Sequence, residues 1–171
     1  EYLSRCSGGF PEPLTFGIRA GRYLRKNPRA YDIVHDNQGL SYGLLFPVFS
    51  GRPLVATIHH PITVDRETDI TAAPGLLSRL KVRRWYSFIP MQKRVARRIS
   101  HIITVSDCSR KDISTEFAIP FDRFHIVPNR INTDYFFPLP GVKRADNTLL
   151  VTNSADTPLK GLRYFLDAVA S

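Results

Sequence analysis

The sequence predicts an α/β fold with a doubly wound parallel sheet, and three observations support this prediction. Short apolar runs of strand length recur at residues 31–35, 53–58, 101–105 and 124–127. The run PLVATI at 53–58 is continuously apolar, which is typical of a strand that is buried on both faces of a sheet. Longer stretches of helical character separate the runs, and this alternation indicates βαβ units.

Three helices are expected around these runs. The first two cover residues 14–27 and 39–49, and Pro28 ends the first of them. The third begins after Ser106, whose hydroxyl can accept a hydrogen bond from the first helical turn, and it runs to about residue 117. Right-handed crossovers through such helices would connect one parallel strand to the next.

The segment between the second and third runs has two parts. Residues 59–74 are polar without apolar periodicity, which predicts a long loop. Residues 76–98 carry basic and apolar side chains and no acidic one, which predicts a single basic amphipathic helix with a kink at Pro90. The basic residues are Arg79, Lys81, Arg83, Arg84, Lys93, Arg94, Arg97 and Arg98.

Three interpretations of this basic helix stay open. It can pack on the core and present a charged face to water, lie on an anionic membrane surface, or contact nucleic acid. The formal net charge of +9 favours anionic partners in general and does not choose among them. Because no nucleic-acid-binding module is recognisable around the helix, we expect no nucleic-acid partner.

The alternation of strands and helices stops before a segment rich in Pro and charged residues, 138–147, which reads as an interdomain linker. After it, residues 148–152 predict a strand and residues 160–170 an amphipathic helix. One strand and one helix cannot bury a core of their own. We therefore expect residues 1–137 to form one domain and residues 148–171 to be the truncated start of a second.

Composition excludes several classes of protein. With 43% hydrophobic and 23% charged residues, the chain has the composition of a globular protein and not of a disordered one. No apolar run approaches the roughly 18–20 residues that span a bilayer, and no secretory signal is visible at the N-terminus. Cys6 and Cys108 show neither metal-ligand spacing nor disulfide density. We expect two reduced thiols in a cytoplasmic protein.

Candidate functional residues follow the strands, because ligands of a parallel sheet collect at the carboxyl ends of its strands. His59 and His60 end the second run and open the polar segment with Asp65 and Arg66. A histidine at this place can act as a general base, orient a sugar hydroxyl, or serve only as a structural hydrogen-bonding group. Adjacent histidines point apart and no third ligand has useful spacing, so we expect no metal site. The candidate loops follow residues 35, 58, 105 and 127.

A second candidate site lies in the segment DTPLKG at residues 156–161. Lys160 and Gly161 begin the last expected helix, and a helix N-terminus can bind phosphate through its free backbone N–H groups and the positive end of its dipole. A lysine in the first turn adds a mobile cation for a diphosphate.

Five segments, in this order and spacing, resemble the retaining family-4 glycosyltransferases of the GT-B fold. They are YDIVHDNQGLSYGLL, PLVATIHHP, RRISHIITVSDCSRKDI, FHIVPNRINTDYFFP and SADTPLKGL, and they cover nearly the whole chain from about residue 31. The resemblance implies two Rossmann-like domains, of which the first binds the acceptor and the second the nucleotide-sugar. The chain would then hold the acceptor domain without its first strand, and the first strand and helix of the donor domain.

The resemblance also implies roles for single residues. His59 matches the histidine of the family's Thr-x-His pattern, near the sugar and the acceptor, and is the candidate catalytic residue. Ser106 and Asn129 match residues that line the cleft. Lys160, with Gly161 beside it, matches the lysine that contacts the donor diphosphate. His60, Asp65 and Arg66 would belong to the acceptor loop.

Two departures from the family pattern concern the turn after the fourth run and the donor site. Arg130 stands where the family's Pro-Asn-Gly turn has glycine, which removes easy access to a positive φ. The family's Gly-Arg pair falls on Asn153 and Ser154, so the arginine expected to hold the phosphates is missing. Ser154 or Thr157 would then rebuild the donor contact.

We therefore expect a glycosyltransferase that transfers a hexose from a nucleotide-diphosphate sugar to an acceptor with retention, without a metal or another cofactor. The chain as given would be inactive by itself. The expected acceptor is a glycan, a lipid or a small molecule, and the basic helix 76–98 would bring the cytoplasmic protein to an anionic membrane surface. The alternative is a non-enzymatic basic module that binds an anionic polymer or a lipid surface.

Overall fold

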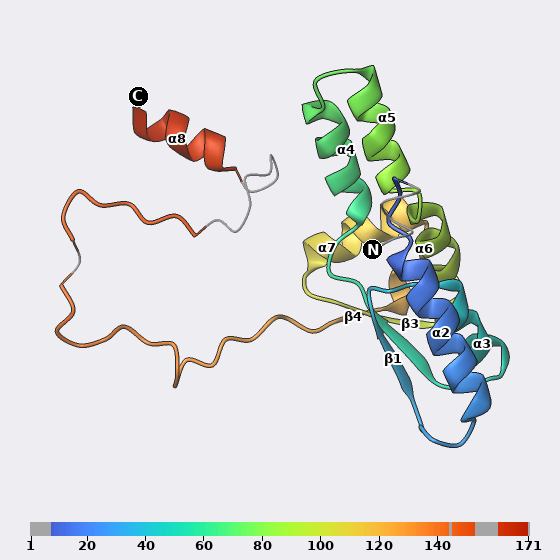
Figure 1. Ribbon diagram of the computed structural model, residues 1–171. Coiled ribbons are helices and arrows are strands. Elements are labelled where there is room, and N and C mark those ends of the chain that lie inside the picture. The colour runs from blue at the N-terminus through green and yellow to red at the C-terminus, as the bar shows by residue number, and fades with distance from the viewer. Residues whose placement is uncertain (1–7, 144, 153–160, 171) are drawn as a thin grey trace. The chain divides into compact units, whose positions relative to one another are not determined.

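The computed structural model of the protein describes residues 8–143, 145–152 and 161–170 (Figure 1). By its internal contacts the chain divides into two units, Glu1–Pro128 and Asn129–Ser171. The first unit contains the sheet, and the described part of the second contains helix α8, Leu162–Ala170. The domain border expected near residue 137 stays a prediction.

Among the described residues, four strands form one parallel sheet in the order β1–β2–β3–β4. The strands are β1 (Val34–Asn37), β2 (Leu54–Thr57), β3 (His101–Thr104) and β4 (Phe124–Ile126). Asp36, Ala56, Ile102 and Phe124 pair in one row across the sheet, so the carboxyl ends of the strands lie along one edge. The predicted α/β class with a parallel sheet is confirmed.

Helices precede the sheet and connect its strands (Figure 1). Helix α2 (Glu12–Lys26) comes before β1, and the 3-10 turn Tyr42–Leu44 and α3 (Leu45–Phe49) lead to β2. The next connection contains α4 (Ile62–Ala72), α5 (Leu76–Trp85) and α6 (Ile89–Ala96), and α7 (Asp107–Phe117) with the 3-10 turn Phe121–Arg123 leads to β4. The expected helix at 39–49 is therefore shorter and begins with a 3-10 turn.

Glycines let α2 approach the turn after β1 closely. A Cβ atom added at Gly17 would overlap the hydroxyl of Ser41, and one added at Gly43 would overlap the carbonyl oxygen of Gly17. Side chains at these positions would push α2 away, because well-packed interiors leave no space for extra atoms. The two glycines thus keep α2 beside the chain that leaves the sheet.

The core of the first unit is apolar and continuous. It is made by β2 and β3, by α6 with the turn after it, and by α7. Its fully buried members include Leu40, Ala56, Ile58, Ile89, Val95, Ala96, Ile99, Ile102, Ile113 and Phe117. Strand β2 lies between β1 and β3, and its run is buried on one face only: Leu54, Ala56 and Ile58 are buried, whereas Val55 and Thr57 on the other face are half-buried.

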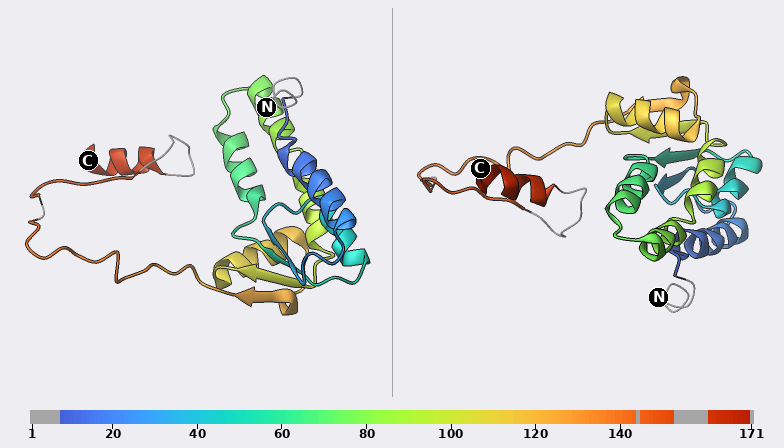
Figure 2. Two further views of the ribbon diagram at one scale, coloured as in Figure 1. Left: turned by 60° about the horizontal axis from the view of Figure 1, so that its bottom comes forward. Right: turned by 90° about the horizontal axis from the view of Figure 1, so that it is seen from above.

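The expected long loop at 59–74 is wrong, because most of it forms helix α4. Its β-branched residues have low helix propensity, and its polar surface gives little apolar periodicity, so local signals do not reveal it. The helix is stabilised from outside: α4 packs against α5, and the Tyr86 hydroxyl donates a hydrogen bond of 2.7 Å to Asp69. Figure 2 shows the two helices projecting together from the sheet.

The single kinked helix expected over 76–98 is also wrong. The chain forms two helices, α5 and α6, which are separated at Tyr86–Phe88. Pro90 lies in the first turn of α6, where its missing N–H group has no helical partner in any case. The proline therefore begins a helix here and does not bend one.

The strand expected at 148–152 is not formed. These residues have no regular structure, and Leu149 and Leu150 are 68% and 88% exposed. A strand depends on hydrogen bonds to a neighbouring strand, and none is present in the described part of this unit. The expected helix at 160–170 is found as α8.

None of the helices within the described residues has the length and apolar character that crossing a membrane requires.

Candidate functional site

Three polar segments meet where β1, β2 and α6 come together at the carboxyl edge of the sheet. We call Asn37, Gln38, His59 and Gln92 the strand-tip cluster. Asn37 ends β1 and Gln38 follows it, while His59 stands two residues after the end of β2 and Gln92 lies in the first turns of α6. Because Asn37 pairs with Thr57 in the sheet, the two strand ends lie side by side.

Gln38 holds the end of β2 through both ends of its side-chain amide. Its Oε1 accepts a hydrogen bond of 2.9 Å from the backbone N–H of His59, and its Nε2 donates one of 3.2 Å to the carbonyl oxygen of His60. The Gln38 carbonyl in turn accepts a 3.2 Å hydrogen bond from Nε2 of the buried Gln92. Gln38 therefore ties β1, the His59–His60 segment and α6 together.

The side chain of His59 is half-buried and has a partner on β1. Its Nε2 lies 2.9 Å from Oδ1 of Asn37. When Nε2 carries the proton it donates to Asn37, and Nδ1 is then an acceptor that can take a proton or orient a hydroxyl. The ring is thus fixed at the strand end by one side-chain bond and, through its backbone, by Gln38.

The turn after β1 adopts an uncommon backbone. Gln38 and Leu40 have φ values of 57° and 46°, in the left-handed region that side chains other than glycine rarely adopt. The buried Asp36 stabilises this turn, because its Oδ2 accepts a hydrogen bond of 2.8 Å from the backbone N–H of Leu40. Burial raises the pKa of Asp36, and hydrogen bonds from the backbone of Leu40 and Gly39 oppose that rise in part.

His60 points to a different partner from His59. Its Nε2 lies 3.0 Å from Oδ2 of Asp65, in the first turn of α4. Arg66 is next in α4 and donates to Glu67 at 3.0 Å. The acceptor-loop residues Asp65 and Arg66 are therefore helical, which corrects their expected place in a loop.

Ser106 lies at the end of β3 and begins α7, as the sequence predicts. Its Oγ accepts a hydrogen bond of 3.1 Å from the backbone N–H of Ser109 and donates one of 3.1 Å to the Ser109 hydroxyl. Beside it, the hydroxyl of Thr104 is buried without a protein partner among the described residues. Ser106 thus acts as a helix cap here, and its lining of a ligand site stays a prediction.

The other predicted site residues belong to the second unit. Asn129 is exposed and begins the second unit. Gly161 has a φ of 71° and lies directly before α8. Lys160, Ser154 and Thr157 lie outside the described residues, so the donor-binding site at the start of α8 stays a prediction.

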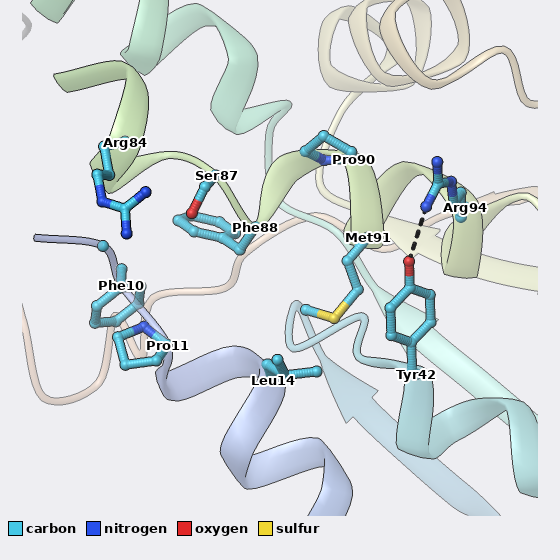
Figure 3. A pocket seen from close by; sticks show the side chains of 11 residues that line it. Phe10, Pro11, Leu14, Tyr42, Arg84, Ser87, Phe88, Pro90, Met91 and Arg94 are labelled. Atoms are coloured by element: carbon cyan, nitrogen blue, oxygen red, sulfur yellow. Dashed lines mark hydrogen bonds between the residues drawn. The ribbon is translucent and has the colours of Figure 1, made fainter. Parts of the chain in front are cut away.

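A pocket of about 380 Å³ lies between the start of α2, the turn at Tyr42 and the start of α6 (Figure 3). Phe10, Leu14, Phe88 and Met91 give it apolar walls. Arg84 and Arg94 also line it, and Arg94 donates a hydrogen bond of 3.1 Å to the hydroxyl of Tyr42. We call this the α2–α6 pocket.

Comparison with known proteins identifies the family. The family model described as Glycosyltransferase Family 4 matches residues 4–135. The chain belongs to glycosyltransferase family 4. It is also 49% identical, over 170 residues and 99% of its length, to a curated protein named MMP alpha-(1->4)-mannosyltransferase from Mycolicibacterium hassiacum. The chain spans 41% of the length of that relative.

Sequence reasoning located the loop after β1 but missed the residues in it that matter. The sequence gives no specific reason to select Asn37 and Gln38, which supply the side-chain bonds from the described residues to the His59–His60 backbone and to the ring of His59, or Gln92, which bonds to the Gln38 carbonyl. The available signal was a run of polar residues, Asp36 to Gln38, at a strand end. Gln92 gave no local signal, because it sits 54 residues from its partner.

Among the described residues, no group of three or more His, Cys, Asp or Glu side chains is arranged to hold a metal ion. Cys108 is a free, exposed thiol on α7.

Proposed function

We propose that the protein is a glycosyltransferase that transfers a hexose from a nucleotide-diphosphate sugar to an acceptor with retention of anomeric configuration. The observation that carries the proposal is the half-buried His59, held at the carboxyl edge of the sheet by Asn37 and Gln38. Membership of glycosyltransferase family 4 supports the reaction class. The name of the 49% identical relative favours a mannosyl group as the transferred sugar.

His59 positions the reacting groups in this proposal. Its ring is fixed by Asn37, so a sugar or acceptor hydroxyl can meet it in one orientation, and positioned groups contribute much of a catalytic rate. Gln38 is a positioning residue, because it holds the His59 backbone, and Gln92 supports it through a hydrogen bond to the Gln38 carbonyl.

The donor diphosphate would bind at the start of α8. Lys160 neutralises charge that develops on the leaving diphosphate, and the first N–H groups of the helix, next to Gly161, donate hydrogen bonds to it. Ser154 and Thr157 replace the arginine that the family pattern has at this site. No metal ion or other cofactor takes part in this scheme.

Acceptor binding is assigned to the first unit. Ser106 at the end of β3 and the pair His60–Asp65 would contact an acceptor, with Arg66 as a cation on α4. Asn129, the first residue of the second unit, stays a predicted cleft residue. The bond between His60 and Asp65 couples the strand end to α4, so a substrate that contacts one of them orders both.

A cytoplasmic enzyme that lies at an anionic membrane surface is the location that we propose. Helix α5 supports it, because Leu76 and Leu77 are 72% and 76% exposed beside a row of basic side chains. Such a surface combines apolar insertion with attraction to anionic lipids.

The test uses the protein expressed from its complete coding sequence. UDP-, GDP- and ADP-mannose are screened for thermal stabilisation, and the donor that binds is used for transfer to mannoside acceptors with the anomer of the product read by NMR. We expect one donor to raise the melting temperature and an α-linked product to form from it. Lys160→Ala should weaken donor binding, with Arg163→Ala, on the exposed surface of α8, as its matched control. A protein that binds a nucleotide-sugar and yields only an inverted product would overturn the retaining mechanism.

A further inference from the structure

The α2–α6 pocket combines apolar walls with two cations. Its rings come from Phe10 and Phe88, whose centroids lie 5.7 Å apart at an angle of 66°, and Leu14 and Met91 extend the apolar surface (Figure 3). Arg94 is a polar group of the pocket whose side chain is held in place by a hydrogen bond, to the hydroxyl of Tyr42. Small-molecule sites have this character: mostly apolar walls with a few polar groups that fix orientation.

The charged side chains in the described lining of the pocket are basic. Arg84 and Arg94 line it, and the described residues of its lining include no Asp or Glu. Arg94 bonds to the Tyr42 hydroxyl through Nη1, and the described residues offer its other N–H donors no further protein partner. A guanidinium with donors to spare, beside apolar walls, suits a planar carboxylate or a phosphate, which it can bind with two parallel hydrogen bonds.

The pocket is connected to the strand-tip cluster through two elements. Tyr42 follows Gln38 by four residues, so their Cα atoms are no more than about 15 Å apart, since consecutive Cα atoms are separated by about 3.8 Å. On α6, Met91 lines the pocket and its neighbour Gln92 bonds to Gln38. Ser41 also contacts Met91, with 3.9 Å between Oγ and Sδ. The turn after β1 and the start of α6 therefore contribute residues both to the pocket and to the strand-tip cluster.

From these observations we infer that the α2–α6 pocket binds the end of the acceptor away from the reacting hydroxyl, and that this end carries an anionic group on an apolar or ring-shaped body. The inference rests on the proposed transferase function, because it names the class of acceptor. A volume of about 380 Å³ suits one such group and not an extended chain. Arg94 binds the anion, while Phe10 and Phe88 contact the ring.

Binding of three aryl mannosides to the complete protein, measured by isothermal titration without any donor, tests this inference. 4-Carboxyphenyl α-mannoside and the corresponding phenyl phosphate monoester carry the anion, and 4-carbamoylphenyl α-mannoside is the neutral match. We expect the charged probes to bind roughly ten- to a hundredfold more tightly than the neutral one, as hydrogen bonds to charged groups do. The stronger of the two charged probes identifies the anion as a carboxylate or a phosphate.

Arg94→Gln should remove this preference and leave the affinity for the neutral probe unchanged. Arg79→Gln is the matched control, because it removes the same charge from the exposed face of α5 outside the pocket, and it should keep the preference. Equal affinity for charged and neutral probes, or an equal loss in both variants, would overturn the inference.

A second variant guards against a folding defect in Arg94→Gln. Leu14 is 38% exposed at the pocket wall, so Leu14→Trp fills the pocket with little strain on the core. It should weaken all three probes, and unchanged binding would contradict the assignment. Because no donor is present, a protein that shows the Arg94-dependent preference but no sugar transfer would refute the proposed function alone.

Discussion

Helices α5 and α6 come from one basic stretch of sequence, yet only α6 is part of the core. Helix α5 buries no residue, and Leu76, Leu77 and Leu80 are between 49% and 76% exposed. Helix α6 buries Ile89, Met91, Gln92, Val95 and Ala96. Both helices carry apolar residues at helical spacing, so the pattern does not separate them. What separates them is position, because α6 leads directly into β3 whereas α5 pairs with α4 and projects from the sheet (Figures 1 and 2).

This difference in burial indicates that the two helices have different roles. Helix α6 supports the sheet, supplies Gln92 to the strand-tip cluster and lines the α2–α6 pocket. Helix α5 presents basic and apolar groups to the outside. Substitutions in α6 should therefore lower the stability of the fold, whereas substitutions in α5 should leave stability nearly unchanged and alter membrane binding.

The largest effect is expected for a truncation in the buried face of α6. Ile89 is 1% exposed, and Ile89→Ala should lower the free energy of unfolding by about 2–5 kcal/mol, because it removes buried methyl groups and leaves a cavity. Urea unfolding followed by circular dichroism measures it. Leu77→Ala in α5 is the control, with a change within about 0.5 kcal/mol. A similar loss of unfolding free energy in Ile89→Ala and Leu77→Ala would contradict the assignment of α6, and not α5, to the core.

The next effect concerns the turn that α6 supports. Asp36→Ala leaves the buried N–H of Leu40 without its acceptor and should cost about 1–3 kcal/mol. Asp36→Asn keeps an acceptor and removes the buried charge, so it should cost much less. Urea unfolding of the two variants at pH 7 separates the lost hydrogen bond from the charge, and a larger cost for Asp36→Asn would refute this account.

Because of Asp36, we also expect the stability of the fold to depend on pH. Burial raises its pKa above the ordinary value, so the folded protein binds this proton more tightly than the unfolded chain does. Stability from this group is therefore complete below the unfolded pKa of about 3.9 and is lost as the pH rises through the folded value. Relative to wild type, Asp36→Asn should gain stability as the pH rises from about 4. A difference that is constant across pH would mean that the carboxyl group is not perturbed.

A smaller effect is expected where α6 meets the strand-tip cluster. Gln92→Leu removes the hydrogen bond to the Gln38 carbonyl and should cost about 1 kcal/mol of stability. Because Gln38 holds His59, kcat/KM for transfer should fall severalfold while donor affinity is kept. Arg79→Gln in α5 should change neither quantity. Loss of stability with unaltered kcat/KM would leave Gln92 with a structural role only.

The smallest effect on stability, and the one that concerns α5 most directly, comes from its exposed leucines. Replacing both Leu76 and Leu77 by Ser should change the unfolding free energy by no more than about 0.5 kcal/mol. It should nevertheless reduce co-sedimentation with vesicles that contain phosphatidylserine, and salt should reduce it too. Vesicles of phosphatidylcholine alone are the control. Unchanged binding in the double variant would exclude α5 as the membrane contact.

The elements with strong local signals could be predicted from the sequence. The four apolar runs become strands β1 to β4, and the hydroxyl of Ser106 caps α7 as its position predicts. Helix α4 could not be predicted in this way, because contacts with α5 and the bond between Tyr86 and Asp69 stabilise it more than its own residues do. The strand expected at 148–152 was wrong for a related reason, since a strand forms only beside a partner.

The candidate site shows the same limit. His59 was found because it ends an apolar run, which is a local signal. Gln38 and Gln92 were missed because their importance lies in bonds across 21 and 54 residues of sequence. Residue type and position along the chain indicate where a site lies, whereas the residues that orient it emerge only after folding.

The most direct test of the account is the rate of sugar transfer by His59→Ala in the complete protein, with His125→Ala as the matched control. His125 is exposed on β4 and lies 3.2 Å from His101, away from the strand-tip cluster. We expect His59→Ala to lower kcat/KM by roughly 10² or more, the size typical of a positioned catalytic group, and His125→Ala to leave it nearly unchanged. Equal kcat/KM in His59→Ala and wild type would contradict the role of the strand-tip cluster in transfer.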